Sequence, residues 1–258
     1  MHTDSEQSSY FDRIWAAFIF FTRLPLWRLH EPQRESYRTV VEHWPLTGWL
    51  TGGLMAATLY AGSSFLPYMV AVVLAIVVRV LATGALHEDG LADFFDAFGG
   101  GGSDRGRVLA IMKDSHIGTY GVLGLILYVM LLALTLFSMP PRVAALTVLA
   151  ADPFAKMLSS TLITLPYARN EAEAKAKMVY RKIRWSACIG LILQGMLPLG
   201  LLLWQMGLGW WPIVASPCLM MCFLYMFIRR RLQGYTGDCC GAVCLLVELT
   251  TYLTACVL

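Results

Sequence analysis

Charged residues are scarce in this chain. Lysine, arginine, aspartate and glutamate make up only 14% of its 258 residues, whereas 57% are hydrophobic. Soluble domains carry about 25% charged residues, so this shortage excludes an ordinary soluble domain. The net charge is only +3 and no basic strip is interleaved with aromatic residues, which also excludes nucleic acid as a partner.

The chain also lacks the cysteine patterns of zinc sites and disulfide frameworks. None of its seven cysteines forms a CxxC pair with a matching histidine partner, and their number is odd. All but Cys239 and Cys240 lie within apolar runs, where cysteine behaves as a small hydrophobic residue. The first residues have no basic segment and no small-residue cleavage site, so no removed signal peptide is expected.

Long apolar runs are what the sequence has instead. A membrane-spanning helix needs about 20 predominantly apolar residues, and such runs recur along the chain. We predict an all-α fold, a polytopic integral membrane helical bundle that forms a single membrane-embedded catalytic domain over residues 1–258. About seven spans are expected, over residues 45–66, 68–86, 118–137, 142–165, 185–206, 210–228 and 240–258. The shorter run at 14–26, which Arg23 interrupts, is expected to form an interfacial or re-entrant helix.

The distribution of cations predicts the orientation of the bundle. Alternate connections hold nearly all lysines and arginines, at residues 28–38, 105–113, 169–184 and 229–231. The charged stretch 166–184 is expected to form a surface helix. By the positive-inside rule, the long polar connections face the cytoplasm. We therefore expect a multi-pass protein of the cell inner membrane with its active site on the cytoplasmic face.

The most polar long run, residues 81–119, contains three aspartates at helical spacing. Asp89, Asp93 and Asp96 recur at i, i+4 and i+7 and fall within about 60° of one another on a helix. Acids in such a row often mark only a solvated helix face. Here they follow an apolar run directly, where exposed acids are costly and tend to be functional. We predict that the three aspartates hold a hard divalent ion, most plausibly Mg²⁺.

Glycines and basic residues follow the aspartates. The run Gly99–Gly102 is expected to end the helix. Donors suited to phosphate oxygens come next, namely Arg105, Arg107, Lys113 and His116. Acids and bases together predict a site for a metal-bridged diphosphate. Asp114 is either a general base or a supporting residue, and spacing alone does not decide between the two roles.

A second polar group lies at residues 229–241, with the sequence RRRLQGYTGDCCG. Its arginines alone are explained equally well as a positive-inside anchor. Asp238 fits that explanation less well, because it begins the next apolar run. A carboxylate there either caps the following helix or joins the metal site, and we favour a role in the site.

Several of these segments resemble the cobalamin synthase family, the adenosylcobinamide-GDP ribazoletransferases. They are FFTRLPL, GALHEDGLADFFDAFGGG, RVLAIMKDSHIGTYGVLGLIL and GYTGDCCGA. The resemblance runs from about Phe20 to the C-terminus. The family's HLDGLAD motif reads HEDGLAD at residues 87–93. Around residues 152–156 the sequence DPFAK departs from a Ser-Arg pair of the family, and Lys156 stands where that arginine is expected.

The resemblance implies a Mg²⁺-dependent transfer in vitamin B12 biosynthesis. The 3′-hydroxyl of α-ribazole, or of its 5′-phosphate, would attack the cobinamide-side phosphorus of adenosylcobinamide-GDP, and GMP would leave. On this interpretation Asp89 and Asp93 are catalytic as well as metal-binding, and Asp114 or Asp238 orients the attacking hydroxyl. The lipid bilayer is the remaining expected partner. Whether the chain forms a homo-oligomer stays open.

Two other functions stay open at this stage. A CDP-alcohol phosphatidyltransferase also combines membrane helices with an acidic Mg²⁺ motif, but it needs an arginine where this chain has Asp93. A cation-coupled transporter would use the acidic row as an ion site, and it would show paired broken helices in corresponding halves. The apolar runs show no such pairing.

Overall fold

The computed structural model describes residues 9–169 and 179–258, and within these ranges the chain is helical. The only β contact there is an isolated bridge between Tyr167 and Tyr235. The predicted all-α class is therefore confirmed. The α-helices are α1 (Tyr10–Phe21), α2 (Trp44–Gly62), α3 (Tyr68–Thr83), α4 (Leu86–Gly100), α5 (Arg105–Lys113), α6 (Thr119–Phe137), α7 (Pro141–Ser159), α8 (Trp185–Met206), α9 (Pro212–Leu232) and α10 (Gly237–Ala255). The longer 3₁₀ segments are η2 (Arg34–His43) and η3 (Ser160–Thr164).

Prolines mark where several of the long helices begin. Pro45, Pro141 and Pro212 lie in the first turns of α2, α7 and α9, respectively. Proline has no N–H to donate, and the first turn of a helix leaves its N–H groups unpaired in any case. Each apolar run can therefore start as a helix directly after a short connection.

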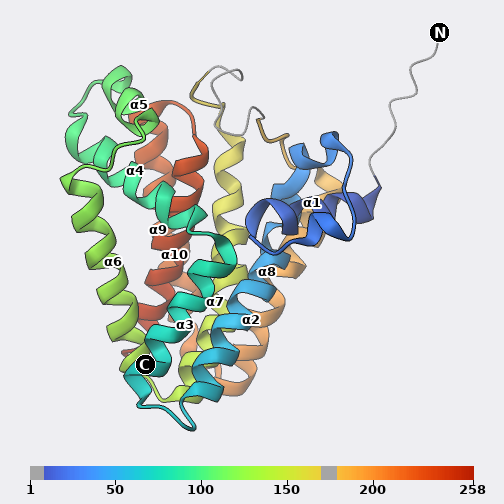
Figure 1. The fold of residues 1–258 in the computed structure, drawn as a ribbon, viewed down its shortest axis with the longest axis vertical. Coiled ribbons are helices and arrows are strands. Elements are labelled where there is room, and N and C mark those ends of the chain that lie inside the picture. Colours follow the sequence, from blue (N-terminus) through green and yellow to red (C-terminus); the bar gives the residue numbers. More distant parts are fainter. Residues whose placement is uncertain (1–8, 170–178) are drawn as a thin grey trace.

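The long helices run side by side along the longest axis of the molecule, with α10 among them (Figure 1). α10 packs against α4, α7 and α9, and α2 packs against α7 and α3. Val243, Leu245 and Val247 of α10 are fully buried. α10 is thus the central helix against which both the bundle and the polar helix α4 are placed.

Within residues 9–169 and 179–258, five helices are long and apolar enough to cross a membrane, and the bent pair of α3 and α4 makes six if it counts as one span. They match the predicted spans at 118–137, 142–165, 185–206, 210–228 and 240–258. The predicted span at 45–66 is the 19-residue α2. It is not among these five helices, so this predicted span is not confirmed. α1 has only 12 residues, as expected of a helix too short to span.

A sharp elbow separates α3 from α4, whose axes differ by 92°. Gly84 and Ala85 both adopt left-handed backbone conformations, with φ of 65° and 57°. Glycine enters this region freely, whereas an alanine there is strained. The Arg23 N–H donates to the Ala82 carbonyl at 2.7 Å and ties the segment after α1 to the elbow. The predicted span at 68–86 therefore ends early, and α4 turns away from its direction.

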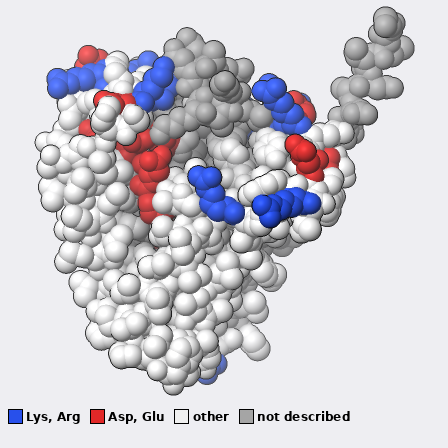
Figure 2. Space-filling view, in the orientation of Figure 1, with Lys and Arg blue, Asp and Glu red and all other residues white. Residues whose placement is uncertain are grey.

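Charged side chains gather at one end of the molecule, the end at which α4 and α5 lie (Figures 1 and 2). Acidic side chains form a strip over α4 there (Figure 2). This matches the alternation of cation-rich and cation-poor connections in the sequence. The predicted surface helix at 166–184 falls partly on residues 170–178, which lie outside the described residues. Its flanks, 166–169 and 179–184, are not helical.

Two ion pairs are buried between the long helices. Arg79 of α3 and Glu248 of α10 face each other with both Nη–Oε distances at 2.8 Å. Asp152 and Lys156 pair within α7, and the Thr51 hydroxyl of α2 donates to Asp152 Oδ2 at 2.7 Å. Unpaired charges are costly in an apolar interior, so these pairs fix how α2, α3, α7 and α10 meet. The segment DPFAK, which lies within α7, thus contacts α2 through Asp152.

Candidate active site

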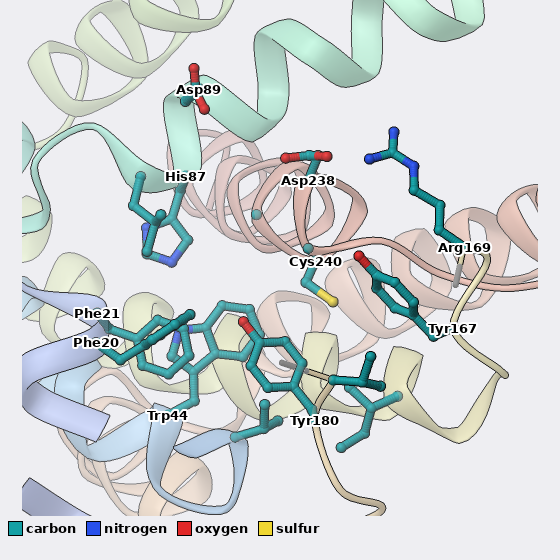
Figure 3. Close-up of a pocket in the computed structure, with 16 residues that line it drawn as sticks. Phe20, Phe21, Trp44, His87, Asp89, Tyr167, Arg169, Tyr180, Asp238 and Cys240 are labelled. Atoms are coloured by element: carbon teal, nitrogen blue, oxygen red, sulfur yellow. The ribbon is translucent and has the colours of Figure 1, made fainter. Parts of the chain in front are cut away.

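A pocket of about 300 Å³ lies where α4 and α10 meet the segments around α1 and α7. Asp89 comes from the first turn of α4, and Asp238 from the first turn of α10. Both carboxylates line the pocket (Figure 3). Its remaining lining residues are Phe20, Phe21, Val41, Trp44, Leu86, His87, Ile163, Tyr167, Arg169, Val179, Tyr180, Gly237, Cys240 and Gly241.

One side of the pocket is aromatic. The Phe21 and Trp44 rings stack with centroids 5.1 Å apart and planes 15° apart. His87 lies nearly parallel to both, with its ring centroid 5.8 Å from that of Trp44 and 6.3 Å from that of Phe21. Phe20 and Tyr180 meet edge to face beside them. These rings come from α1, α2, α4 and the segment before α8, and together they form the apolar floor of the pocket.

The opposite side of the pocket is polar. Asp89 is exposed and Asp238 is buried, and Arg169 and Tyr167 stand beside Asp238 (Figure 3). An Nη atom of Arg169 donates to the Leu109 carbonyl at 2.8 Å, which joins this side chain to α5. Burial raises the pKa of the Tyr167 phenol, with Arg169 opposing the shift and Asp238 adding to it. The phenol therefore stays protonated at neutral pH and can donate a hydrogen bond.

The three predicted metal ligands all lie on α4, but they have different surroundings. Asp89 lines the pocket and Asp93 lies one turn further along, half-buried. Asp96 is buried, and its carboxylate accepts the Gly118 and Gly121 N–H groups at 2.7 and 2.8 Å. It thereby caps the N-terminus of α6 from a neighbouring helix. Among the described residues, no group of three or more His, Cys, Asp or Glu side chains is placed to hold a metal ion.

The predicted phosphate donors lie on or just after α5, and none of them lines the pocket. Arg105 donates from Nε to the Leu232 carbonyl at 2.7 Å and from Nη2 to the Ala168 carbonyl at 2.8 Å. It thus holds the end of α9 against the segment that carries Arg169. Arg107 and Lys113 are exposed at the charged end of the molecule.

Asp114 and His116 form an exposed pair after α5. His116 Nδ1 lies 2.7 Å from Asp114 Oδ1, and the His116 backbone N–H donates to the same oxygen at 3.1 Å. The hydrogen bond from the His116 side chain lowers the pKa of Asp114 below its ordinary value. Neither residue lines the pocket, so the structure brings together Asp89 and Asp238 but not Asp114.

Sequence reasoning missed much of the pocket. The sequence identifies Phe20 and Phe21 only as part of a family segment, and it does not single out Trp44 at all. Arg169 was counted only as a cation of a polar connection. The bridge between Tyr167 and Tyr235, with its backbone hydrogen bonds, brings Arg169 to the start of α10. No local pattern signals a contact between residues so far apart in sequence.

Comparisons with known proteins agree on one family. Residues 13–256 match the family model described as cobalamin-5-phosphate synthase. An adenosylcobinamide-GDP ribazoletransferase of Shewanella baltica (strain OS155) is 34% identical over 245 residues, which cover 93% of this chain and 92% of the relative. The enzyme of the same name from Shewanella frigidimarina is 34% identical over the same shares, and that of Shewanella putrefaciens is 33% identical over 94% and 92%. No solved structure matches the chain significantly.

Proposed function

The chain belongs to the cobalamin-5-phosphate synthase family, and from that membership we propose how its pocket serves the family reaction. It is an adenosylcobinamide-GDP ribazoletransferase of cobalamin synthesis. This membership decides against the CDP-alcohol phosphatidyltransferase and the transporter. The substrates are adenosylcobinamide-GDP and α-ribazole or its 5′-phosphate.

The reaction exchanges a phosphoanhydride bond for a phosphate ester bond. The α-ribazole 3′-oxygen forms a bond to the cobinamide-side phosphorus, and the bond from that phosphorus to the bridging oxygen breaks. GMP leaves with the bridging oxygen, and the hydroxyl proton passes to a base. Such an exchange asks the protein to position two reactants and to neutralise charge.

Asp238 is the residue that we assign to the attacking hydroxyl. It is buried at the first turn of α10 and lines the pocket, within which a hydroxyl can reach it. Asp114, the other predicted base, is exposed and paired with His116. Arg169 and the Tyr167 phenol stand beside Asp238 (Figure 3), where they can donate to phosphate oxygens as charge builds up.

Asp89 and Asp93 are the carboxylates that we assign to Mg²⁺. Mg²⁺ is usually held by one or two carboxylates together with substrate phosphates and water, so a site without three protein ligands fits it. Asp89 is exposed on the pocket, and Asp93 follows on the next turn. Bound Mg²⁺ would neutralise charge on the diphosphate. Asp96, the third predicted ligand, already accepts two backbone N–H groups, so we assign it to placing α4 against α6.

The exposed cations of α5 are assigned to long-range attraction. Arg107 and Lys113 are exposed on α5, and His116 is exposed just after it. These side chains would draw in the anionic guanylate half of the donor substrate. Arg105 is assigned instead to placing the segment that carries Arg169, because its Nε and Nη2 atoms donate to the Leu232 and Ala168 carbonyls. By the positive-inside rule, the charged end of the molecule faces the cytoplasm at the inner membrane.

The observation that carries this assignment is the joint lining of one pocket by Asp89 and Asp238. The test is GMP release from adenosylcobinamide-GDP by purified protein, with and without α-ribazole, at millimolar Mg²⁺ and after chelation. We expect release that requires both α-ribazole and Mg²⁺. Release that persists in chelator would contradict the metal assignment, and no release under any condition would contradict the function.

A further inference from the structure

The aromatic floor of the pocket has no role in phosphate chemistry. It consists of Phe20, Phe21, Trp44, His87 and Tyr180. The planes of Phe21, Trp44 and His87 lie within 15° of one another. Parallel rings that border a cavity offer a flat face on which another planar aromatic group can stack. Phosphate and ribose have no such face, so the floor suits a different part of a substrate.

Two ring nitrogens on this floor are buried and, among the described residues, have no hydrogen-bond partner. They are Trp44 Nε1 and His87 Nε2. The residues are only 2% and 3% exposed. An indole N–H is always a donor, and an imidazole nitrogen is a donor or an acceptor. Buried polar atoms are nearly always satisfied, so a ligand with ring nitrogens is the chemistry that completes this floor.

The size of the pocket selects between the two substrates. About 300 Å³ is at the low end of the range for small-molecule sites. It suits a heteroaromatic base with its sugar, whereas a corrin ring with its side chains is far larger. Asp238 lies across the pocket from Phe21 and Trp44, and Asp89 lies beyond His87 on α4 (Figure 3). A base on the floor therefore directs its sugar hydroxyls towards the carboxylates.

We propose that the floor of Phe21, Trp44 and His87 binds the benzimidazole base of α-ribazole by stacking. This inference rests on the proposed function, and it assigns the pocket to the nucleoside rather than to the corrinoid. The fused benzo ring lies against the apolar rings, and the free ring nitrogen of the base is a hydrogen-bond partner for Trp44 Nε1 or His87 Nε2. These residues then determine which bases the enzyme accepts.

The first test measures α-ribazole binding directly, by equilibrium dialysis with the purified full-length protein. Trp44→Leu removes the stacking face and should weaken binding about tenfold or more. Trp44→Phe keeps a flat ring and should recover most of the affinity. Trp204→Leu is the matched control, because Trp204 is 81% exposed near the far end of α8. Unchanged binding in Trp44→Leu, or no binding by the wild type, would overturn the inference.

GMP release measured in parallel separates this inference from the proposed function. A wild type that binds α-ribazole but releases no GMP counts against the function alone. Where GMP is released, Trp44→Leu should raise KM for α-ribazole about tenfold and leave KM for adenosylcobinamide-GDP within about twofold. The opposite pattern would place the corrinoid on the floor and overturn the inference.

A ligand series keeps the test independent of any variant that fails to fold. The wild-type protein is offered the ribosides of benzimidazole, of imidazole and of indole. Imidazole lacks the fused ring, and indole keeps the bicyclic shape but replaces the free ring nitrogen with C–H. Both should bind about tenfold more weakly than benzimidazole. Equal affinity for imidazole and benzimidazole ribosides would overturn the stacking assignment.

Discussion

Gly90 of α4 lies directly against the backbone of Asp238 in α10. A β-carbon added at Gly90 would stand 2.9 Å from the Asp238 carbonyl oxygen and 3.1 Å from its Cα. Only glycine permits so close an approach of two helices. The contact sets the separation of α4 and α10, and with it the separation of the carboxylates of Asp89 and Asp238 across the pocket.

Replacing Gly90 should therefore impair turnover more than folding. In Gly90→Ala the new methyl group pushes α4 away from α10, and a displacement of about 1 Å near reacting groups can cost on the order of 100-fold in rate. We expect kcat/KM to fall at least tenfold. Gly53→Ala is the control, since a β-carbon there meets nothing within 4 Å. Normal activity in Gly90→Ala would show that this spacing is not critical.

Asp89 and Asp96 should respond differently to substitution, although both lie on α4. Asp89→Asn should lower kcat at least about 100-fold, because it weakens a ligand of the proposed Mg²⁺ site. Asp96→Ala removes the acceptor of two N–H groups at the start of α6 and should cost about 1–3 kcal/mol of stability. Thermal unfolding in detergent and Mg²⁺ titrations of activity distinguish the two. A stable Asp96→Ala protein with altered Mg²⁺ dependence would support metal binding by Asp96 instead.

Arg105 should prove structural and Arg107 should not. Arg105→Ala leaves the carbonyls of Leu232 and Ala168 without their donor, which should lower the unfolding midpoint by several degrees, from a loss of about 1–3 kcal/mol. Lysine cannot reach both carbonyls with the same geometry, so Arg105→Lys should give little recovery. Arg107→Ala, at an exposed neighbouring position, should leave the midpoint unchanged. A raised KM in Arg105→Ala at an unchanged midpoint would indicate direct phosphate binding.

The pair of Asp114 and His116 should not govern the pH dependence of the reaction. The hydrogen bond lowers the Asp114 pKa below its ordinary value of 3.8. A carboxyl with a lowered pKa contributes stability above its unfolded pKa and loses that contribution as pH falls through the folded pKa. Between pH 6 and 9 Asp114 stays ionised, so no change should arise from it.

We therefore expect Asp114→Asn and His116→Ala to keep kcat within about threefold, with the same pH profile, whereas Asp238→Asn should lose about 100-fold or more. A loss of that size in Asp114→Asn, with a shifted acid limb of the profile, would make Asp114 the base.

The buried pair of Arg79 and Glu248 should matter more when broken than when removed whole. Glu248→Leu leaves the Arg79 guanidinium buried without its partner and should cost about 3–5 kcal/mol. Replacing both residues by leucine removes the charge as well as the pair, so the double variant should be more stable than either single variant. Unfolding midpoints of the four proteins give the coupling. Additive losses would show that the pair contributes nothing beyond packing.

The membrane-spanning helices could be predicted from the sequence, because long apolar runs indicate helices. The runs at 118–137 and 185–206 coincide with α6 and α8 nearly residue for residue, because nothing but a helix satisfies the backbone within an apolar medium. The elbow between α3 and α4 was not predictable. It depends on a left-handed Ala85 and on a hydrogen bond from Arg23 to Ala82, and neither leaves a local signal.

The site was predictable where polar residues break an apolar pattern. Asp89 and Asp238 both lie in the first turn of a helix beside apolar sequence, and a carboxylate in such a place is costly. Trp44 and Phe21 lie among other apolar residues. The sequence around such residues looks the same whether their side chains face lipid or a cavity. Arg105 shows another limit of sequence-based prediction. The sequence shows that a hydrogen-bond donor is present, but it does not show whether the acceptor is a phosphate or a backbone carbonyl.

The gathering of charged side chains at one end of the bundle has a consequence for energetics. With the active site oriented as proposed, both substrates would arrive at, and both products would leave from, the compartment that this end faces. The reaction then moves nothing vectorially across the bilayer and can draw no work from an ion gradient. Its driving force must come entirely from the diphosphate linkage that it consumes, and the bilayer serves to hold the catalyst at a surface.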